Sequence, residues 1–150
     1  MLGAPVAAKD RETLLFARFS GIQGDVVDKR HTGWIRALSW APAMPKGQRC
    51  TEGSVNCLND NGHRITVLRA PDATSQALGD AAVAGTRFDE VKLEIYGEIG
   101  SDYWADTLTF QGVRIEAVAV KHRLFRRVEV LTLVYERKTG HTSSWSEAYR

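Results

Sequence analysis

Residues 91–96 read VKLEIY, and apolar side chains occupy every second position of this stretch. Residues 113–120, VRIEAVAV, repeat the two-residue period at their start, and residues 128–135, VEVLTLVY, are apolar at nearly every position. Side chains of a strand point alternately to its two faces, so alternation predicts a half-buried strand and a continuous apolar run predicts one covered on both faces. The second half of the chain is therefore predicted to be a β-sheet.

The first half predicts further strands and one helix. Short aromatic or β-branched runs at 13–20, 34–40 and 64–68 end at glycine or proline and predict strands. Residues 75–85, SQALGDAAVAG, have apolar side chains at helical spacing, with Ser75 as the expected N-cap and Gly85 as the C-terminal stop. Short strands and one helix predict a mainly β fold, a two-sheet β-barrel or sandwich with one flanking α-helix.

The length of 150 residues suits a single domain. We expect its core at about 13–138, with an N-terminal extension at 1–12 and a polar tail at 139–150 that docks through Trp145 or Tyr149. Residues 41–62 have little periodicity and predict a long irregular loop.

Charge and hydropathy narrow the classes of partner. The net charge of +2 does not suggest the basic face that nucleic acid binding requires, so no nucleic acid partner is expected. Residues 1–12 do not resemble a secretory signal, and charged residues interrupt every apolar run before it could span a membrane. The chain is expected to be made in the cytoplasm.

Cys50 and Cys57 leave three interpretations open. Two free thiols fit a reducing compartment, a local disulfide would require an oxidising one, and zinc would need His63 and a fourth ligand. The spacing lacks the C-x-x-C pair typical of zinc sites, so free thiols are favoured and no metal is expected.

No pattern of catalytic residues stands out. His31, His63, His122 and His141 are dispersed, which favours solvated or simple hydrogen-bonding roles. The carboxylates of Asp25 and Asp28, and of Asp102 and Asp106, lie in turn contexts, which favours a role in shaping turns. The chain is therefore predicted to be no enzyme and to need no cofactor.

Tryptophans allow a second interpretation. Trp34 and Trp40 lie an even number of residues apart, so they are expected to share one face of their strand. Such a pair can line a sugar-binding or nucleotide-stacking platform, but on a sheet it more often belongs to a core or a subunit interface.

The order of the motifs resembles one family. Residues 19–25, FSGIQGD, are followed by DKRHTGWIRALSW at 28–40, then by a helix with Asp72 and Ser75 near its start, and finally by LTLVYERK at 131–138. This order is similar to that of the haemolysin-coregulated proteins (Hcp), the tube proteins of type VI secretion. The family motif falls on Gly21, Gly24, Trp34, Asp72, Ser75 and Gly85.

The resemblance implies a structural function. Hcp proteins form hexameric rings that stack into the inner tube of a contractile machine, with a sheath, a spike and effectors as partners. The tube is expelled without a signal peptide, and effectors can travel in its lumen. The loop implied to contact the next ring spans residues 24–33 here, with the charged residues Asp25, Asp28, Lys29, Arg30 and His31.

Two alternatives stay open. A tail-tube subunit of a phage or another contractile particle would share this architecture. A monomeric β-sandwich could instead bind sugars or small molecules through Trp34, Trp40 or Trp104.

Overall fold

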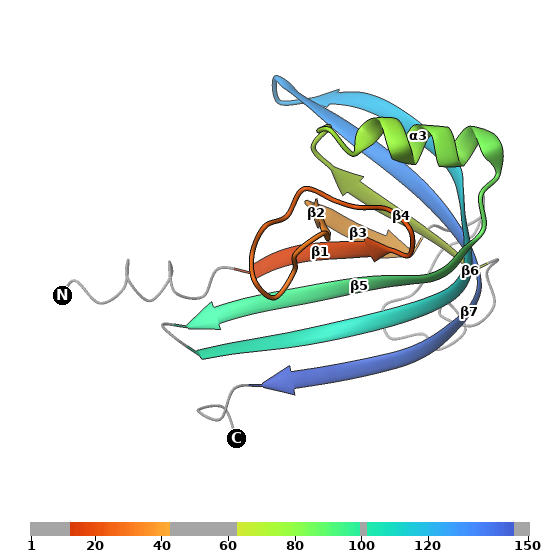
Figure 1. Ribbon diagram of the computed structural model, residues 1–150. Helices are drawn as coiled ribbons and strands as arrows, with labels where there is room; N and C mark the ends of the chain where they lie inside the picture. The colour runs from red at the N-terminus through yellow and green to blue at the C-terminus, as the bar shows by residue number, and fades with distance from the viewer. Residues whose placement is uncertain (1–12, 43–62, 100–101, 146–150) are drawn as a thin grey trace.

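A single antiparallel sheet dominates the computed structural model, which describes residues 13–42, 63–99 and 102–145 (Figure 1). Its strands, given by their bounds, are β1 (Thr13–Phe19), β2 (Ile35–Ala37), β3 (Ser39–Pro42), β4 (Arg64–Arg69), β5 (Phe88–Ile99), β6 (Asp102–Arg123) and β7 (Arg126–Trp145), and the described helix is α3 (Ser75–Ala84). The mainly β fold with one flanking helix is confirmed. The 41–62 loop with Cys50 and Cys57 lies, beyond Pro42, outside the described residues.

The sheet is strongly curled because its two edge strands are neighbours in the chain. The strand order is β2-β1-β5-β6-β7-β4-β3, and only Leu38 separates β2 from β3. The Leu38 N–H donates to the Leu68 carbonyl at 2.7 Å, so the chain leaves β1 and joins β4 at this residue. One residue can connect the two edges only if the sheet curls until they meet, as Figure 1 shows.

This change of partner overturns one expectation. Residues 34–40 were predicted as one strand with Trp34 and Trp40 on a common face, but the strand is broken at Leu38. Trp34 packs with Phe16 on one side of β1, whereas Trp40 packs against the main core. The expected common face of Trp34 and Trp40 is therefore wrong, whereas the favoured interpretation of both as packed residues agrees with their positions.

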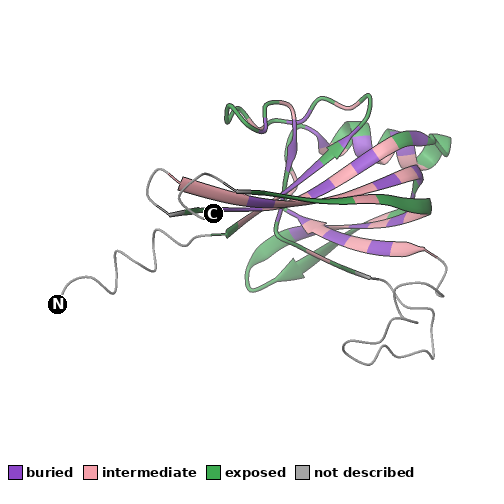
Figure 2. Cartoon of the chain, turned by 90° about the horizontal axis from the view of Figure 1, so that it is seen from below, coloured by how far each residue is buried: buried purple, intermediate pink, exposed green. Residues whose placement is uncertain are grey.

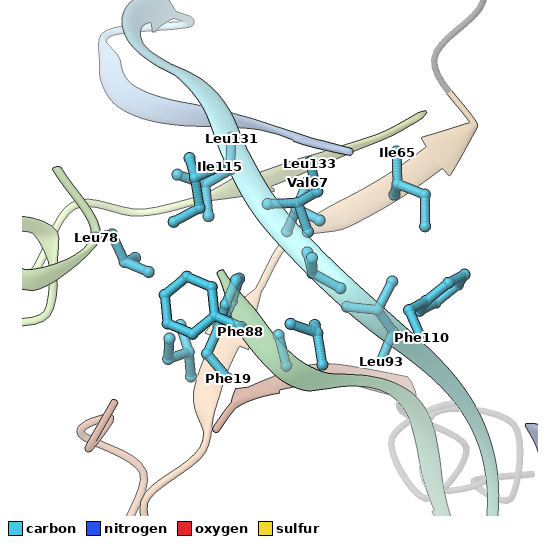
Figure 3. Packing of buried hydrophobic residues seen from close by; sticks show 14 of the residues in the cluster. Phe19, Ile65, Val67, Leu78, Phe88, Leu93, Phe110, Ile115, Leu131 and Leu133 are labelled. Atoms are coloured by element: carbon cyan, nitrogen blue, oxygen red, sulfur yellow. The ribbon is translucent and has the colours of Figure 1, made fainter. Parts of the chain in front are cut away.

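The main core fills the inside of the curled sheet. Figure 3 shows Phe19 and Phe88 on the side of Leu78 of the helix and Leu93 beside Phe110, and all belong to one cluster with residues from β4 and β7. Leu78 is completely buried, which explains how a helix containing Gly79 holds its place on the sheet. The helix ends at Gly85, whose φ of 68° is left-handed, as predicted.

The helix start differs from the prediction. Its N-cap is Thr74, with no side-chain capping bond, rather than Ser75. The hydroxyl of Ser75 instead accepts hydrogen bonds from the Asp72 N–H at 3.0 Å and from Arg69 at 3.2 Å. Ser75 therefore closes the turn before the helix.

The end of β7 also differs from the prediction. Residues 139–145 were expected in a polar tail, yet they continue β7 and pair with β6, with Thr109 opposite Gly140 and Trp104 opposite Trp145. The polar composition reflects exposure: residues 141–144 are exposed while their backbone groups are paired in the sheet.

β1 and β5 are covered on their outer face as well. Alternate residues of β1 point inward to the core and outward to a second cluster made of Phe16, Trp34, Tyr96 and Ala105. Loop 21–33, the segment between β1 and Trp34, lies over this outer face. Figure 2 shows the resulting alternation of buried and less buried residues along the strands.

Candidate functional site: loop 21–33 and its anchor

Three glycines let loop 21–33 fold back on itself. Gly21 and Gly33 have φ values of 88° and 83°, in the left-handed region that favours glycine. Position 24 requires glycine for a different reason, because a Cβ there would lie 2.2 Å from the carbonyl oxygen of Trp34. The family-motif residues Gly21 and Gly24 are thus explained by backbone geometry.

Backbone hydrogen bonds close the loop. Gly24 donates to Gly33 at 2.8 Å, Gly33 donates to Val26 at 2.9 Å, and Val26 donates to Trp34 at 3.1 Å. The loop is therefore a hydrogen-bonded structure with a fixed shape, which presents its outer residues in defined positions.

His31 anchors the loop to the sheet. The residue is 1% exposed, so of the two expected roles, solvated or hydrogen-bonding, His31 has the second. Nδ1 lies 2.6 Å from a carboxylate oxygen of Asp28 within the loop, and Nε2 is bonded to Glu94 of β5. An imidazole with a carboxylate at each nitrogen donates to both when it is protonated, so the site favours the imidazolium.

Aromatic rings enclose this imidazole. It stacks on Phe16 with ring centroids 3.9 Å apart and meets the rings of Trp34 and Tyr96 edge-on at 5.3 and 4.9 Å. Burial opposes the charged form, but the bonds to Glu94 and Asp28 outweigh it and raise the pKa of His31 above 6.5. The bond to His31 in turn lowers the pKa of Asp28.

The five charged residues implied to meet the next ring do not share one environment. Asp28 and His31 pair with each other, and the Arg30 guanidinium lies 3.7 Å from the centre of the Tyr103 ring. Asp25 and Lys29 are exposed. Their role in ring stacking stays a prediction.

A second polar cluster lies at the other family-motif positions. The buried guanidinium of Arg69 pairs with Glu129 of β7 and with Asp72, and it also donates to Ser75. Asp72 accepts from the Thr74 N–H at 2.8 Å as well. Asp72 and Ser75 thus hold the turn into α3 around a buried cation. The sequence offered one signal of this cluster, because Glu129 is a lone acidic residue in an apolar strand and calls for a buried partner.

Both clusters consist of side chains that pair with one another. In residues 13–42, 63–99 and 102–145, no group of three or more His, Cys, Asp or Glu side chains is placed to hold a metal ion. In the same ranges, no helix has the length and apolar character needed to cross a bilayer. Both clusters fix the positions of loops.

The comparisons with known proteins agree with this architecture. The family model described as "Type VI secretion system effector, Hcp" matches residues 16–140. A search of curated proteins found no match.

Solved Hcp structures share the fold. The crystal structure of Hcp2 from Salmonella typhimurium has a TM-score of 0.63 at 16% identity, over 88% of this chain and 93% of that one. A type VI secretion system effector from Yersinia pestis has a TM-score of 0.60 at 18% identity, over 88% and 98%. At these identities the likeness shows the fold, and the family model supplies the relationship: the chain belongs to the Hcp family of type VI secretion tube proteins.

Proposed function

We propose that this chain forms hexameric rings that stack into the inner tube of a type VI secretion system and carry effectors in the lumen. The observation that carries the proposal is the family match over residues 16–140, together with a curled sheet that the solved Hcp structures share. The chain would assemble in the cytoplasm with its sheath and spike and leave the cell when the machine fires.

Loop 21–33 supports a role in stacking. The His31 anchor and the internal hydrogen bonds hold it in one shape, so its exposed residues are preorganised for a partner. Asp25 and Lys29 offer charges of both signs, and Val27 offers an exposed apolar side chain. Surface ion pairs contribute about 0 to 1 kcal/mol each, so stacking through them should weaken as salt rises.

Native mass spectrometry in reducing buffer tests the ring. A six-subunit species supports the proposal, and a monomer at all concentrations contradicts it. A monomer whose tryptophan fluorescence responded to sugars would favour the alternative ligand-binding module.

Lys29→Glu tests stacking separately. Rings should persist, while end-to-end stacks seen by electron microscopy become fewer. Lys138→Glu reverses the charge of a lysine on β7 that is also exposed, and it serves as the matched control. If the parent protein, Lys29→Glu and Lys138→Glu stacked equally well, Lys29 would not take part in the stacking contact.

A further inference from the structure

The β6–β7 hairpin ends in two apolar side chains that nothing in the described chain covers. Leu124 is 91% exposed and Phe125 is fully exposed. The residues from Ala119 to Arg127 are all exposed, and Figure 1 shows the turn standing clear of the rest of the fold. An exposed aromatic at the tip of a paired hairpin is a feature of binding surfaces.

The turn itself has an unfavourable sequence for its shape. Leu124 and Phe125 have φ values of 47° and 67°, and Arg123 pairs with Arg126 across the turn. A two-residue turn with positive φ at both positions favours Asn-Gly, so Leu-Phe there carries local strain. Strain held at an exposed site is a reason to look for a function.

Charge adds a second local cost. The tip sequence KHRLFRR at 121–127 places Arg123 directly opposite Arg126. Like charges in directly opposed positions destabilise a hairpin. An acidic partner surface would relieve this repulsion.

A surface with the complementary properties exists elsewhere on the chain. A pocket of about 370 Å³ lies between β1, loop 21–33 and the end of β5, and its apolar lining includes Leu14, Phe16, Val26 and Val27. Val27 is 89% exposed, so an apolar side chain at this rim is also uncovered. The volume falls in the range of roughly 300–1,000 Å³ typical of pockets that bind drug-sized ligands, which suits two side chains.

More acidic than basic side chains line this acidic pocket: Asp25, Asp28, Asp72 and Glu98 against Arg36. Asp28 already pairs with His31 and Asp72 with Arg69, which leaves Asp25 and Glu98 to meet a cationic partner. The hairpin tip carries one lysine and three arginines around its two apolar residues. The tip and the acidic pocket are therefore complementary in apolar character, and Asp25 and Glu98 supply carboxylates for the cations of the tip.

We infer that the Leu124–Phe125 tip of one copy inserts into the acidic pocket of a second copy of this chain. This inference rests on the proposed ring assembly, and the contact would be one of the interfaces between its subunits. The two surfaces come from different parts of the chain, so the contact is head-to-tail. A contact of this kind closes into a ring or continues along a stack, as the tube requires.

Two replacements at the turn separate docking from folding. Leu124→Asn with Phe125→Gly gives the turn its favoured sequence, so the monomer should resist urea at least as well as the parent protein. Self-association should nevertheless weaken about 10- to 100-fold, because a buried aromatic anchor is lost. Val83→Ala removes a side chain that is 92% exposed on α3 and should leave association unchanged.

Photo-crosslinking identifies the partner surface. The phenyl side chain of Phe125 is replaced by p-benzoylphenylalanine, and the labelled chain is mixed with isotope-labelled chain before irradiation. Crosslinks from position 125 to residues 14–28 of the other isotopic form support the docking. Crosslinks from position 125 to another surface of the chain overturn it. Crosslinks to the lipid of phosphatidylglycerol vesicles, without any crosslink between two copies, also overturn it.

The outcomes also separate this contact from the ring. If hexamers form and the Asn-Gly variant forms them equally well, the docking is wrong and the ring stands. If no hexamer forms but position 125 still crosslinks to residues 14–28 of another copy, the docking stands and the ring is wrong.

Discussion

Glu94, in the middle of β5, bonds to Nε2 of His31, which lies 63 residues earlier in the chain. This bond connects the sheet to loop 21–33, for which we propose a role in stacking. The other carboxylate oxygen of Glu94 accepts from Thr107 at 2.8 Å, so the partner of His31 is itself held in place. The position of loop 21–33 is therefore set by β5 of the curled sheet.

Removing the His31 side chain should loosen this connection. His31→Ala leaves a cavity beside Phe16 and deprives Glu94 of its partner, so the free energy of unfolding should fall by about 2 to 4 kcal/mol. Urea unfolding measures the change. His141→Ala removes an exposed histidine and should change stability by less than about 0.5 kcal/mol; equal losses would contradict the anchor.

The same histidine should make stability depend on pH. Although burial opposes it, pairing with Glu94 and Asp28 raises the folded-state pKa of His31 above 6.5, so the folded protein holds the proton more tightly than the unfolded chain. This stabilisation is full below about pH 6.5 and is lost as pH rises through the folded pKa.

The pH measurement compares the parent protein with His31→Gln. Unfolding free energies are measured between pH 2.5 and 9, and above about pH 6.5 they should fall with rising pH more steeply in the parent than in the variant. At the acid end, the pKa of Asp28 is lowered by its bond to His31, so that contribution is present above the unfolded value of 3.8 and is lost as pH falls. Parallel curves across the whole range would contradict the assignment.

Two glycines with opposite surroundings provide a matched test of the loop. Gly24→Ala should destabilise by about 1 to 3 kcal/mol, because its methyl group would meet the Trp34 carbonyl. Gly79→Ala, with open space around it inside α3, should stabilise by about 0.5 to 1 kcal/mol. Thermal unfolding of both variants distinguishes a loop that needs glycine from one that tolerates alanine.

The buried pair of Arg69 and Glu129 should be strongly coupled. Arg69→Met alone leaves a buried carboxylate without its partner and should cost about 3 to 5 kcal/mol. The double variant with Glu129→Leu removes both charges and should recover much of that loss. A double-mutant cycle in urea that showed simple additivity would contradict the coupling.

Much of the fold could be predicted from local patterns. The alternation at 91–96 and the helical spacing from Ser75 to Gly85 appear directly in β5 and α3, because each reflects one buried face of one element. The end of β7 was missed, because exposed strand residues have a polar composition that resembles a tail. Backbone pairing with β6 decides that segment, and composition does not report pairing.

The sequence by itself determined the mainly β class, the glycine-rich loop and the family relationship, because these depend on short-range periodicity and on the order of motifs along the chain. Only the tertiary structure decided that His31 is buried between Asp28 and Glu94, that Arg69 pairs with Glu129, and that the strand after Trp34 changes partner at Leu38. Each of these depends on segments far apart in the chain: pairing of β4 with β7 places Arg69 opposite Glu129, packing of the loop on β5 brings His31 to Glu94, and curling of the sheet lets the chain pass from β1 to β4 at Leu38. Burial then turns ordinary charged residues into the anchors of the loop and the helix.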